Sequence, residues 1–280
     1  MSDPRSQRIV LKIVDSDAEV IADRAAGVLY ELGFGAAALE EFEGYLTIWT
    51  SGEADAMDLT AALTNEGLWV ERVESVAPDP VDWNEQWKIH FQPFRVGALW
   101  IGPTWHEPPD DAELVLRLDP SMAFGTGLHP STRLCLESLA DLNSRTDLLD
   151  VGTGSGILAL ASLRFGTPAA VGTDVDPESL RVARENAEAN GLSDRFELTG
   201  EPPDALGRAF STVVANILAQ PLIDLAPAIA AATAPGGRVL LAGILETQVP
   251  EVEAAFVAAG LRTRTVRTQG EWALLELDRP

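Results

Sequence analysis

Apolar positions follow two different patterns in the two parts of this chain. In the first 77 residues, two segments with helical spacing lie among four segments that have the composition of strands. We expect strands at 8–14, 36–42, 45–50 and 68–76, and helices at 17–32 and 53–65. From residue 93 onward, short apolar runs alternate with helical segments, which is typical of a parallel sheet covered by helices on both faces.

The first region has the element order strand, helix, strand, strand, helix, strand. This is the order of the ferredoxin-like plan, in which two helices pack on a four-stranded sheet. We therefore expect residues 1–77 to form a small α+β domain. Because the region holds no glycine loop, metal cluster or nucleophile, we expect it to bind a partner; a purely structural or oligomerising role is the alternative.

A linker at residues 78–92 is expected between the two regions. Residues 82–88 have the composition of a short helix that carries Trp83 and Trp87 on one face. These two side chains could bind a ligand, but packing against a neighbouring domain is the more common use of tryptophan. The larger domain would then comprise residues 93–280.

Regular elements are expected along the whole of the larger domain. Strands are expected at 94–100, 113–118, 148–151, 169–174, 196–199, 211–216 and 237–242, and helices at 177–190, 221–232 and 251–259. The last two expected strands, 262–268 and 272–277, flank a Gln-Gly-Glu turn, so we expect them to form a hairpin.

The clearest candidate for a binding site is a glycine-rich turn. A short apolar strand at 148–151 leads into it, and a segment of helical composition follows. Gly152, Gly154 and Gly156 let the backbone approach a ligand where a Cβ atom would collide, and the following helix directs free N–H groups toward that ligand. Such a turn suits a nucleotide-like molecule.

An aspartate ends the next apolar run, 22 residues beyond the first of these glycines. At this position Asp174 can accept hydrogen bonds from both hydroxyls of a ribose. The glycine spacing differs from the dinucleotide pattern, whose third glycine comes one residue later to seat a pyrophosphate. Asp150, at the head of the turn, is a further candidate cofactor contact, although a role in capping the turn explains it equally well. Asp176 and Pro177 are expected to begin the next helix.

A second glycine-containing loop, at residues 121–132, precedes an expected helix. Its glycines allow a flexible turn that can fold over a bound cofactor. The proline at position 130 suits the start of a helix, which places Thr132 in the first turn. We expect His129 to orient its neighbours by hydrogen bonding rather than to act as a general base. The candidate cofactor contacts in this loop are Phe124, Gly125, Thr126, His129 and Thr132.

Two further candidate residues follow one of the expected strands. Asn216 ends the strand at 211–216, and Ile217 comes directly after it. In open α/β sheets ligands bind beyond the carboxyl ends of the strands, so Asn216 should face the same crevice as Gly152 and Asp174. We assign Asn216 and Ile217 to catalysis, and Asn216 also to cofactor binding.

Composition narrows the class of protein. With 280 residues and 46% hydrophobic content, the chain can bury a substantial core. The single cysteine, Cys135, excludes disulfides within the chain, and the Cys and His spacings of a zinc site are absent, so no metal is expected. The sequence starts without the features of a signal peptide and has no apolar run long enough to span a bilayer. We therefore expect a cytoplasmic protein, without membrane contact, and a monomer.

Acidic residues outnumber basic ones throughout, and the net charge is −23. Residues 1–90 hold 18 acidic and 6 basic side chains, a balance of −12, whereas residues 91–280 hold 25 and 14, a balance of −11. Such a charge repels phosphate backbones and favours a basic partner. We expect no direct binding of nucleic acid; adaptation to solubility or salt is the other explanation of the charge.

Together these motifs resemble those of the ribosomal protein L11 methyltransferase family, which modifies a protein of the large ribosomal subunit. The resemblance covers most of the chain and is carried by residues 124–132, 150–158, 174–177, 186–190, 216–218 and 270–272. The first and fifth of these stretches are the most specific. Ser131 stands where the family often has threonine, a small difference.

The resemblance implies a fold, a cofactor and a substrate. The fold would be a doubly wound, mostly parallel, seven-stranded Rossmann-like sheet with an antiparallel last strand. The cofactor would be S-adenosylmethionine, held by Thr132, Gly152, Asp174 and Asn216. The N-terminal domain would recognise the basic protein L11, and residues 93–280 would methylate its α-amine and its lysine ε-amines.

The expected chemistry sets a requirement on the site. An amine must be neutral to attack a methyl group, although free lysine has a pKa of about 10.4. A carboxylate beside the amine would hold its proton, whereas the Asn216 amide oxygen and a nearby backbone carbonyl can orient it with less charge bias. The alternatives are a small-molecule N-methyltransferase and a non-catalytic S-adenosylmethionine-binding assembly factor.

Overall fold

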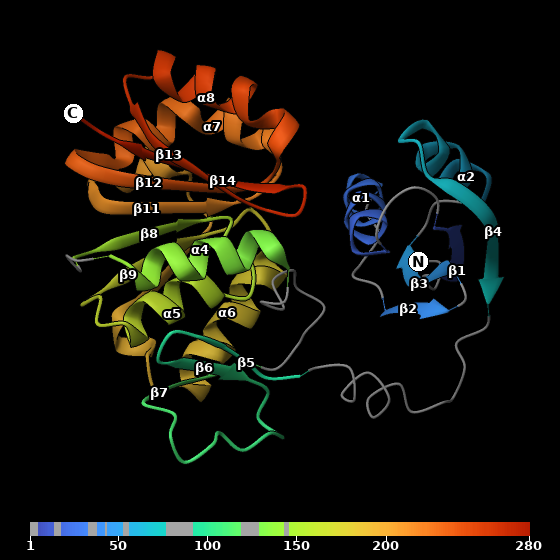
Figure 1. Ribbon diagram of the computed structural model, residues 1–280, viewed down its shortest axis with the longest axis horizontal. Coiled ribbons are helices and arrows are strands. Elements are labelled where there is room, and N and C mark those ends of the chain that lie inside the picture. Colours follow the sequence, from blue (N-terminus) through green and yellow to red (C-terminus); the bar gives the residue numbers. More distant parts are fainter. Residues whose placement is uncertain are drawn as a thin grey trace. The chain divides into compact units, whose positions relative to one another are not determined.

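The computed structural model describes residues 5–13, 18–32, 38–42, 44–52, 56–76, 92–118, 129–142 and 146–280. The chain divides into two compact units, Met1–His90 and Phe91–Pro280, which we describe separately (Figure 1). Most of the expected linker at 78–92, including Trp83 and Trp87 and the helix expected around them, lies outside the described residues. Among the described residues, every helix is too short or too polar to cross a lipid bilayer.

The first unit has the ferredoxin-like order of elements. Its elements are β1 (Arg5–Lys12), α1 (Ala18–Glu31), β2 (Ala38–Phe42), β3 (Tyr45–Gly52), α2 (Ala56–Asn65) and β4 (Trp69–Val76). The strand order is β2-β3-β1-β4, and β1 pairs antiparallel with both β3 and β4. Alternate residues of the central strand, Ile9 and Leu11, are fully buried in a core shared with α1 and α2. Because alternate side chains of a strand point to the same face of a sheet, both residues lie on the face that the helices cover.

The second unit begins with a small three-stranded sheet. It consists of β5 (Phe94–Val96), β6 (Leu99–Gly102) and β7 (Leu114–Arg117), in the order β5-β6-β7. The single strand expected at 94–100 is therefore wrong: β5 and β6 form an antiparallel hairpin. Gly97 turns the chain with φ of +56°, a conformation that glycine adopts without a steric penalty.

A seven-stranded sheet forms the body of the second unit. Its strands are β8 (Leu148–Val151), β9 (Ala170–Thr173), β10 (Phe196–Thr199), β11 (Phe210–Asn216), β12 (Thr233–Leu245), β13 (Arg262–Gln269) and β14 (Trp272–Asp278). Their order is β10-β9-β8-β11-β12-β14-β13. Strand β14 is antiparallel to both of its neighbours, β12 and β13, and the other six strands of this sheet run in one direction. The doubly wound, mostly parallel sheet with an antiparallel last strand is confirmed.

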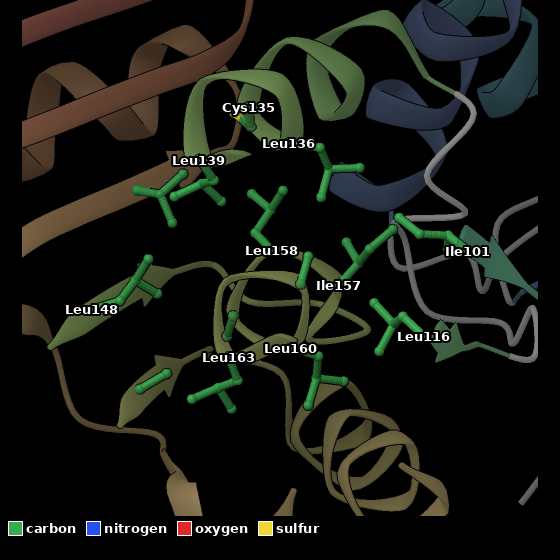
Figure 2. Close-up of a cluster of buried hydrophobic side chains, with 14 of the residues drawn as sticks. Ile101, Leu116, Cys135, Leu136, Leu139, Leu148, Ile157, Leu158, Leu160 and Leu163 are labelled. Carbon is green, nitrogen blue, oxygen red and sulfur yellow. The ribbon is translucent and has the colours of Figure 1, made fainter. Parts of the chain in front are cut away.

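Helices cover both faces of this sheet (Figure 1). They are α4 (Pro130–Ala140), α5 (Ile157–Arg164), α6 (Pro177–Ala189), α7 (Ala219–Ala232) and α8 (Val249–Ala258). Helices α4, α5 and α6 contribute to one apolar cluster, and α7 and α8 contribute to a second. Figure 2 shows the first, in which Leu136 of α4 and Leu158 of α5 pack with Ile101 and Leu116 of the small sheet. Burial of one leucine contributes roughly 1.5–3 kcal/mol, so this cluster holds the small sheet against the larger one.

Candidate active site

The glycine-rich turn joins β8 to α5. Gly152, Gly154 and Gly156 have φ values of +70°, +53° and +80°, which other residues adopt only at a cost. A Cβ atom at Gly152 would lie 2.4 Å from Cγ2 of Ile217, and one at Gly156 would lie 3.0 Å from the ring of Phe196. These two glycines are therefore needed both for the turn and for the close packing around it.

Asp150 lies beneath this turn and is only 1% exposed. Its Oδ2 accepts hydrogen bonds from Thr153 Oγ1 at 2.8 Å and from the Ala159 N–H at 3.2 Å. Burial raises the pKa of Asp150 to about 7; the bonds from Thr153 and Ala159 lower it, and the charge of Asp174 raises it. These contacts are those of a residue that supports the turn and the start of α5. Its role as a cofactor contact stays a prediction.

Asp174 follows β9 and ties the turn to the next helix. Its Oδ2 accepts from the Gly154 N–H at 2.9 Å, and its Oδ1 accepts from the Asp176 N–H at 3.0 Å. The carboxylate is only partly buried. Since a carboxylate oxygen has more than one lone pair, both oxygens can still accept from the hydroxyls of a ribose.

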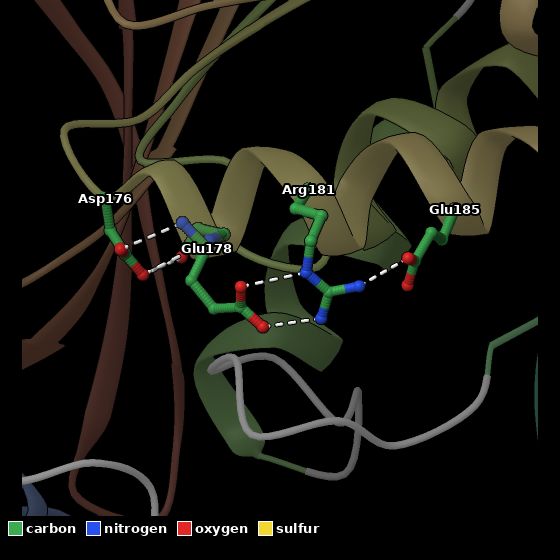
Figure 3. Close-up of polar contacts among 5 residues, drawn as sticks. Asp176, Glu178, Arg181 and Glu185 are labelled. Atoms are coloured by element: carbon green, nitrogen blue, oxygen red, sulfur yellow. Dashed lines mark hydrogen bonds and ion pairs between the residues drawn. The ribbon is translucent and has the colours of Figure 1, made fainter.

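Asp176 caps α6, as the sequence predicted. It accepts from the Glu178 N–H at 3.0 Å and from the N–H and Oγ of Ser179 at 3.1 and 3.0 Å (Figure 3). Burial acts to raise the pKa of Asp176, but the three hydrogen bonds outweigh it and the pKa is lowered. On the exposed face of α6, Arg181 pairs with Glu178 and Glu185. Such exposed pairs contribute little to stability, so the cap is what fixes the start of this helix next to Asp174.

A hydrogen bond joins Asn216 to Thr132, 84 positions apart in the sequence. Nδ2 of Asn216, at the end of β11, donates to Oγ1 of Thr132, in the first turn of α4, at 3.0 Å. Thr132 is 2% exposed, whereas Asn216 is half-buried. Strand β11 is the parallel neighbour of β8, and the side chain of Ile217 packs on Gly152. The structure therefore brings Thr132, Asn216, Ile217 and the glycine-rich turn together at one edge of the sheet.

His129 is the N-cap of α4. Its Nδ1 accepts from the Ser131 N–H at 3.2 Å and lies 2.6 Å from Ser131 Oγ. The imidazole also meets the Trp272 ring edge to face, with ring centres 4.4 Å apart. These contacts agree with an orienting role, while contact with the cofactor stays a prediction. Sequence reasoning gave Trp272 no role, although it ends one of the stretches that carry the family resemblance.

Three candidate contacts are not described by the structure. Phe124, Gly125 and Thr126 lie outside the described residues, which resume at His129.

A separate open cavity of about 370 Å³ lies at the other end of α5 and α6. Arg117, Arg164 and Asn190 line it, and Asn190 exchanges hydrogen bonds with the backbone of Arg117 at 2.9 and 2.6 Å. Arg164 is the last residue of α5 and Asn190 directly follows α6, whereas the candidate site is at the N-terminal ends of these helices. This cavity is therefore not part of the candidate site.

Comparison with known proteins assigns the family. The family model described as "Ribosomal protein L11 methyltransferase (PrmA)" matches residues 11–280. The ribosomal protein L11 methyltransferase of Geobacter metallireducens is 48% identical over 197 residues, which cover 69% of this chain and 65% of that protein. The same enzyme of Azotobacter vinelandii is 48% identical over 199 residues, which cover 70% of this chain and 67% of that protein. The match thus spans about two thirds of the length of these relatives.

A solved structure agrees with this assignment. The crystal structure of ribosomal protein L11 methylase from Lactobacillus delbrueckii subsp. bulgaricus is 32% identical to this chain and superposes with a TM-score of 0.62. The superposition covers 68% of this chain and 99% of that one. The chain belongs to the ribosomal protein L11 methyltransferase family.

Proposed function

We propose that this protein transfers methyl groups from S-adenosylmethionine to amino groups of ribosomal protein L11, namely the N-terminal α-amine and lysine ε-amines. The observation that carries the proposal is the hydrogen bond between Asn216 and Thr132. It places an amide at the sheet edge where Ile217 meets the glycine-rich turn, with Asp174 bonded to that turn. Membership of the family supports the substrate class.

The residues present fit the adenosine part of this cofactor. Asp174 offers acceptors for the ribose hydroxyls, and the turn from Gly152 to Gly156 has no side chains at its three positive-φ positions. When bound, S-adenosylmethionine supplies a methyl group activated by the positive charge on its sulfur. Near that group the chain must hold an amine in line and must not stabilise it as an ammonium ion.

Asn216 is suited to that task. Because its Nδ2 is engaged by Thr132, its Oδ1 is the atom that remains to accept an N–H from a substrate amine. An amide oxygen orients a neutral amine without the full negative charge that would favour its protonated form. Asn216 would hold the amine in line with a methyl donor seated at the turn, and the methylated amine would give its extra proton to water. Positioning of the two reactants would supply most of the acceleration.

The acidic N-terminal region supports a basic protein as the partner. Residues 1–90 carry a formal net charge of −12, and opposite charges speed the encounter of two proteins. We further propose that residues 1–77 recognise L11, that the protein acts as a monomer and that it does so in the cytoplasm.

The test is transfer of labelled methyl from S-adenosylmethionine to purified L11, followed by mass spectrometry of the product. We expect label on L11 but not on free lysine at the same concentration. Asn216→Ala should lower transfer at least tenfold and still bind S-adenosylhomocysteine, whereas Ser193→Ala, an exposed substitution in the second unit, should change neither. Label on free lysine alone would favour the small-molecule enzyme. Cofactor binding without transfer to any ribosomal protein would favour the assembly factor.

A further inference from the structure

Ile217 lies between two glycines that belong to different parts of the sheet. Its side chain packs on Gly152, after β8, as described above. Its backbone packs on Gly243, within β12, where an added Cβ would lie 2.5 Å from the Ile217 carbonyl oxygen and 2.9 Å from its carbonyl carbon and its nitrogen. Gly243 also has φ of +79°. The main chain around Ile217 can occupy this place only if residue 243 has no side chain.

The contact lies where the regular pairing of β12 changes. The parallel ladder between β11 and β12 ends with Asn216 opposite Ala242, and the register between β12 and β14 shifts between Leu241 and Ile244. Gly243 therefore sits in an irregular part of β12, beside the peptide that follows Asn216. With Thr132 bonded to the Asn216 side chain, contacts from α4, the glycine-rich turn and β12 all fix this short segment.

The carbonyl oxygen of Ile217 is an acceptor that the described part of the protein does not use. Among the hydrogen bonds of the described residues, none ends on this oxygen. Ile217 as a whole residue is only partly buried. A methyl group at position 243 would instead press against the oxygen from 2.5 Å and displace the peptide.

We infer that Gly243 is a positioning residue for methyl transfer. By lacking a side chain, it holds the Ile217 peptide in a place where the carbonyl oxygen, next to the Asn216 amide, is a second acceptor for the substrate amine. Two acceptors fix the direction of the nitrogen lone pair better than one. This inference rests on the proposed function, in which an amine is the methyl acceptor.

A matched control is present in the same strand. Gly236 also has a positive φ, +74°, but a Cβ added there would meet nothing within 4 Å. Gly236→Ala therefore carries the conformational cost of alanine at positive φ without any contact to Ile217. Comparison with Gly243→Ala separates the backbone cost from displacement of the Ile217 peptide.

The experiment compares the two variants in the full chain. We expect Gly243→Ala to lower the rate of methyl transfer to L11 about 10- to 100-fold, since a displacement near 1 Å can cost that much. Its affinity for S-adenosylhomocysteine, measured by calorimetry, should change less than threefold, and Gly236→Ala should keep both properties. Equal transfer by the two variants would overturn the inference, as would a loss of cofactor affinity that accounts for the loss of transfer.

A second measurement separates this inference from the proposed function. The side-chain ¹⁵N resonance of Asn216, assigned through Asn216→Ser, should shift in Gly243→Ala and stay in place in Gly236→Ala. If the wild type transfers no methyl to L11, the proposed function fails. If the Asn216 resonance does not shift in Gly243→Ala, the role of Gly243 is overturned, whatever the result for the proposed function. Should Gly243→Ala fail to fold, Gly243→Ala with Ile217→Gly gives the peptide room to move. Normal transfer by that double variant would contradict the inference.

Discussion

Asp150 should make the stability of this protein depend on pH. Burial raises its pKa from 3.8 to about 7, so the folded state binds a proton that the unfolded state releases near pH 4. One pKa unit corresponds to about 1.36 kcal/mol, and the full difference therefore corresponds to about 4 kcal/mol. The stabilisation from the protonated form is complete below pH 4 and is lost as the pH rises toward and through 7.

Asp150→Asn tests this dependence. The amide oxygen can still accept from Thr153 and Ala159, but the side chain no longer ionises. The unfolding free energy of the variant minus that of the wild type should therefore rise by several kcal/mol between pH 4 and pH 8, on top of a constant cost for the amide. The lowered pKa of Asp176 makes stability rise with pH. Because Asp176 is present in both proteins, its contribution cancels when the two unfolding free energies are subtracted.

The assay is urea unfolding at half-unit pH steps, followed by circular dichroism. Asp194→Asn, which replaces an exposed carboxylate on the same domain, is the control. A difference between Asp150→Asn and the wild type that does not change from pH 4 to pH 8 would refute the reasoning, because the buried carboxylate would then ionise as easily as an exposed one.

Three further substitutions test the site. Gly152→Ala should destabilise the protein by about 2–4 kcal/mol, from positive φ and the Ile217 contact, and Ile217→Ala should restore about half in a double-mutant cycle of urea unfolding. Thr132→Val should lower methyl transfer about tenfold with little change in S-adenosylhomocysteine affinity, and equal loss of both would contradict the Asn216 contact. Asp176→Ala should cost about 1 kcal/mol of unfolding free energy at pH 7 and clearly less at pH 3; no loss would exclude the cap.

The periodic elements could be predicted because each depends on nearby residues. The run at 148–151, the glycines after it and the next apolar run predicted a strand, a turn, a helix and a second strand in the order that the structure has, while the ligand at this edge stays a prediction. The cap at Asp176 followed from an aspartate before a proline. Parallel strands bring their carboxyl ends to one edge, so Asn216 could be assigned to the same edge as Gly152 from the sheet rule alone.

Contacts that depend on distant parts of the chain could not be predicted in this way. The strand expected at 237–242 stops one residue before Gly243, and the contact of this glycine with Ile217 is visible only in the folded sheet. The hairpin at Gly97 was missed because β5 and β6 together have the composition of one continuous strand. Trp272 could be singled out from the family resemblance, but its contact with His129 depends on how the last hairpin packs on α4.

The position of β14 affects how the protein can be made. This strand is synthesised after β13, yet it lies between β12 and β13, and β13 pairs with no other described strand. Until residues 272–278 have left the ribosome, β13 has no partner and the edge of β12 stays open. Leu274 and Leu275, both fully buried, then seal the two apolar layers on opposite faces of the sheet. A nascent chain stalled a few residues before this strand should thus be open to proteases and chaperones, because the seven-stranded sheet is complete only once β14 has emerged.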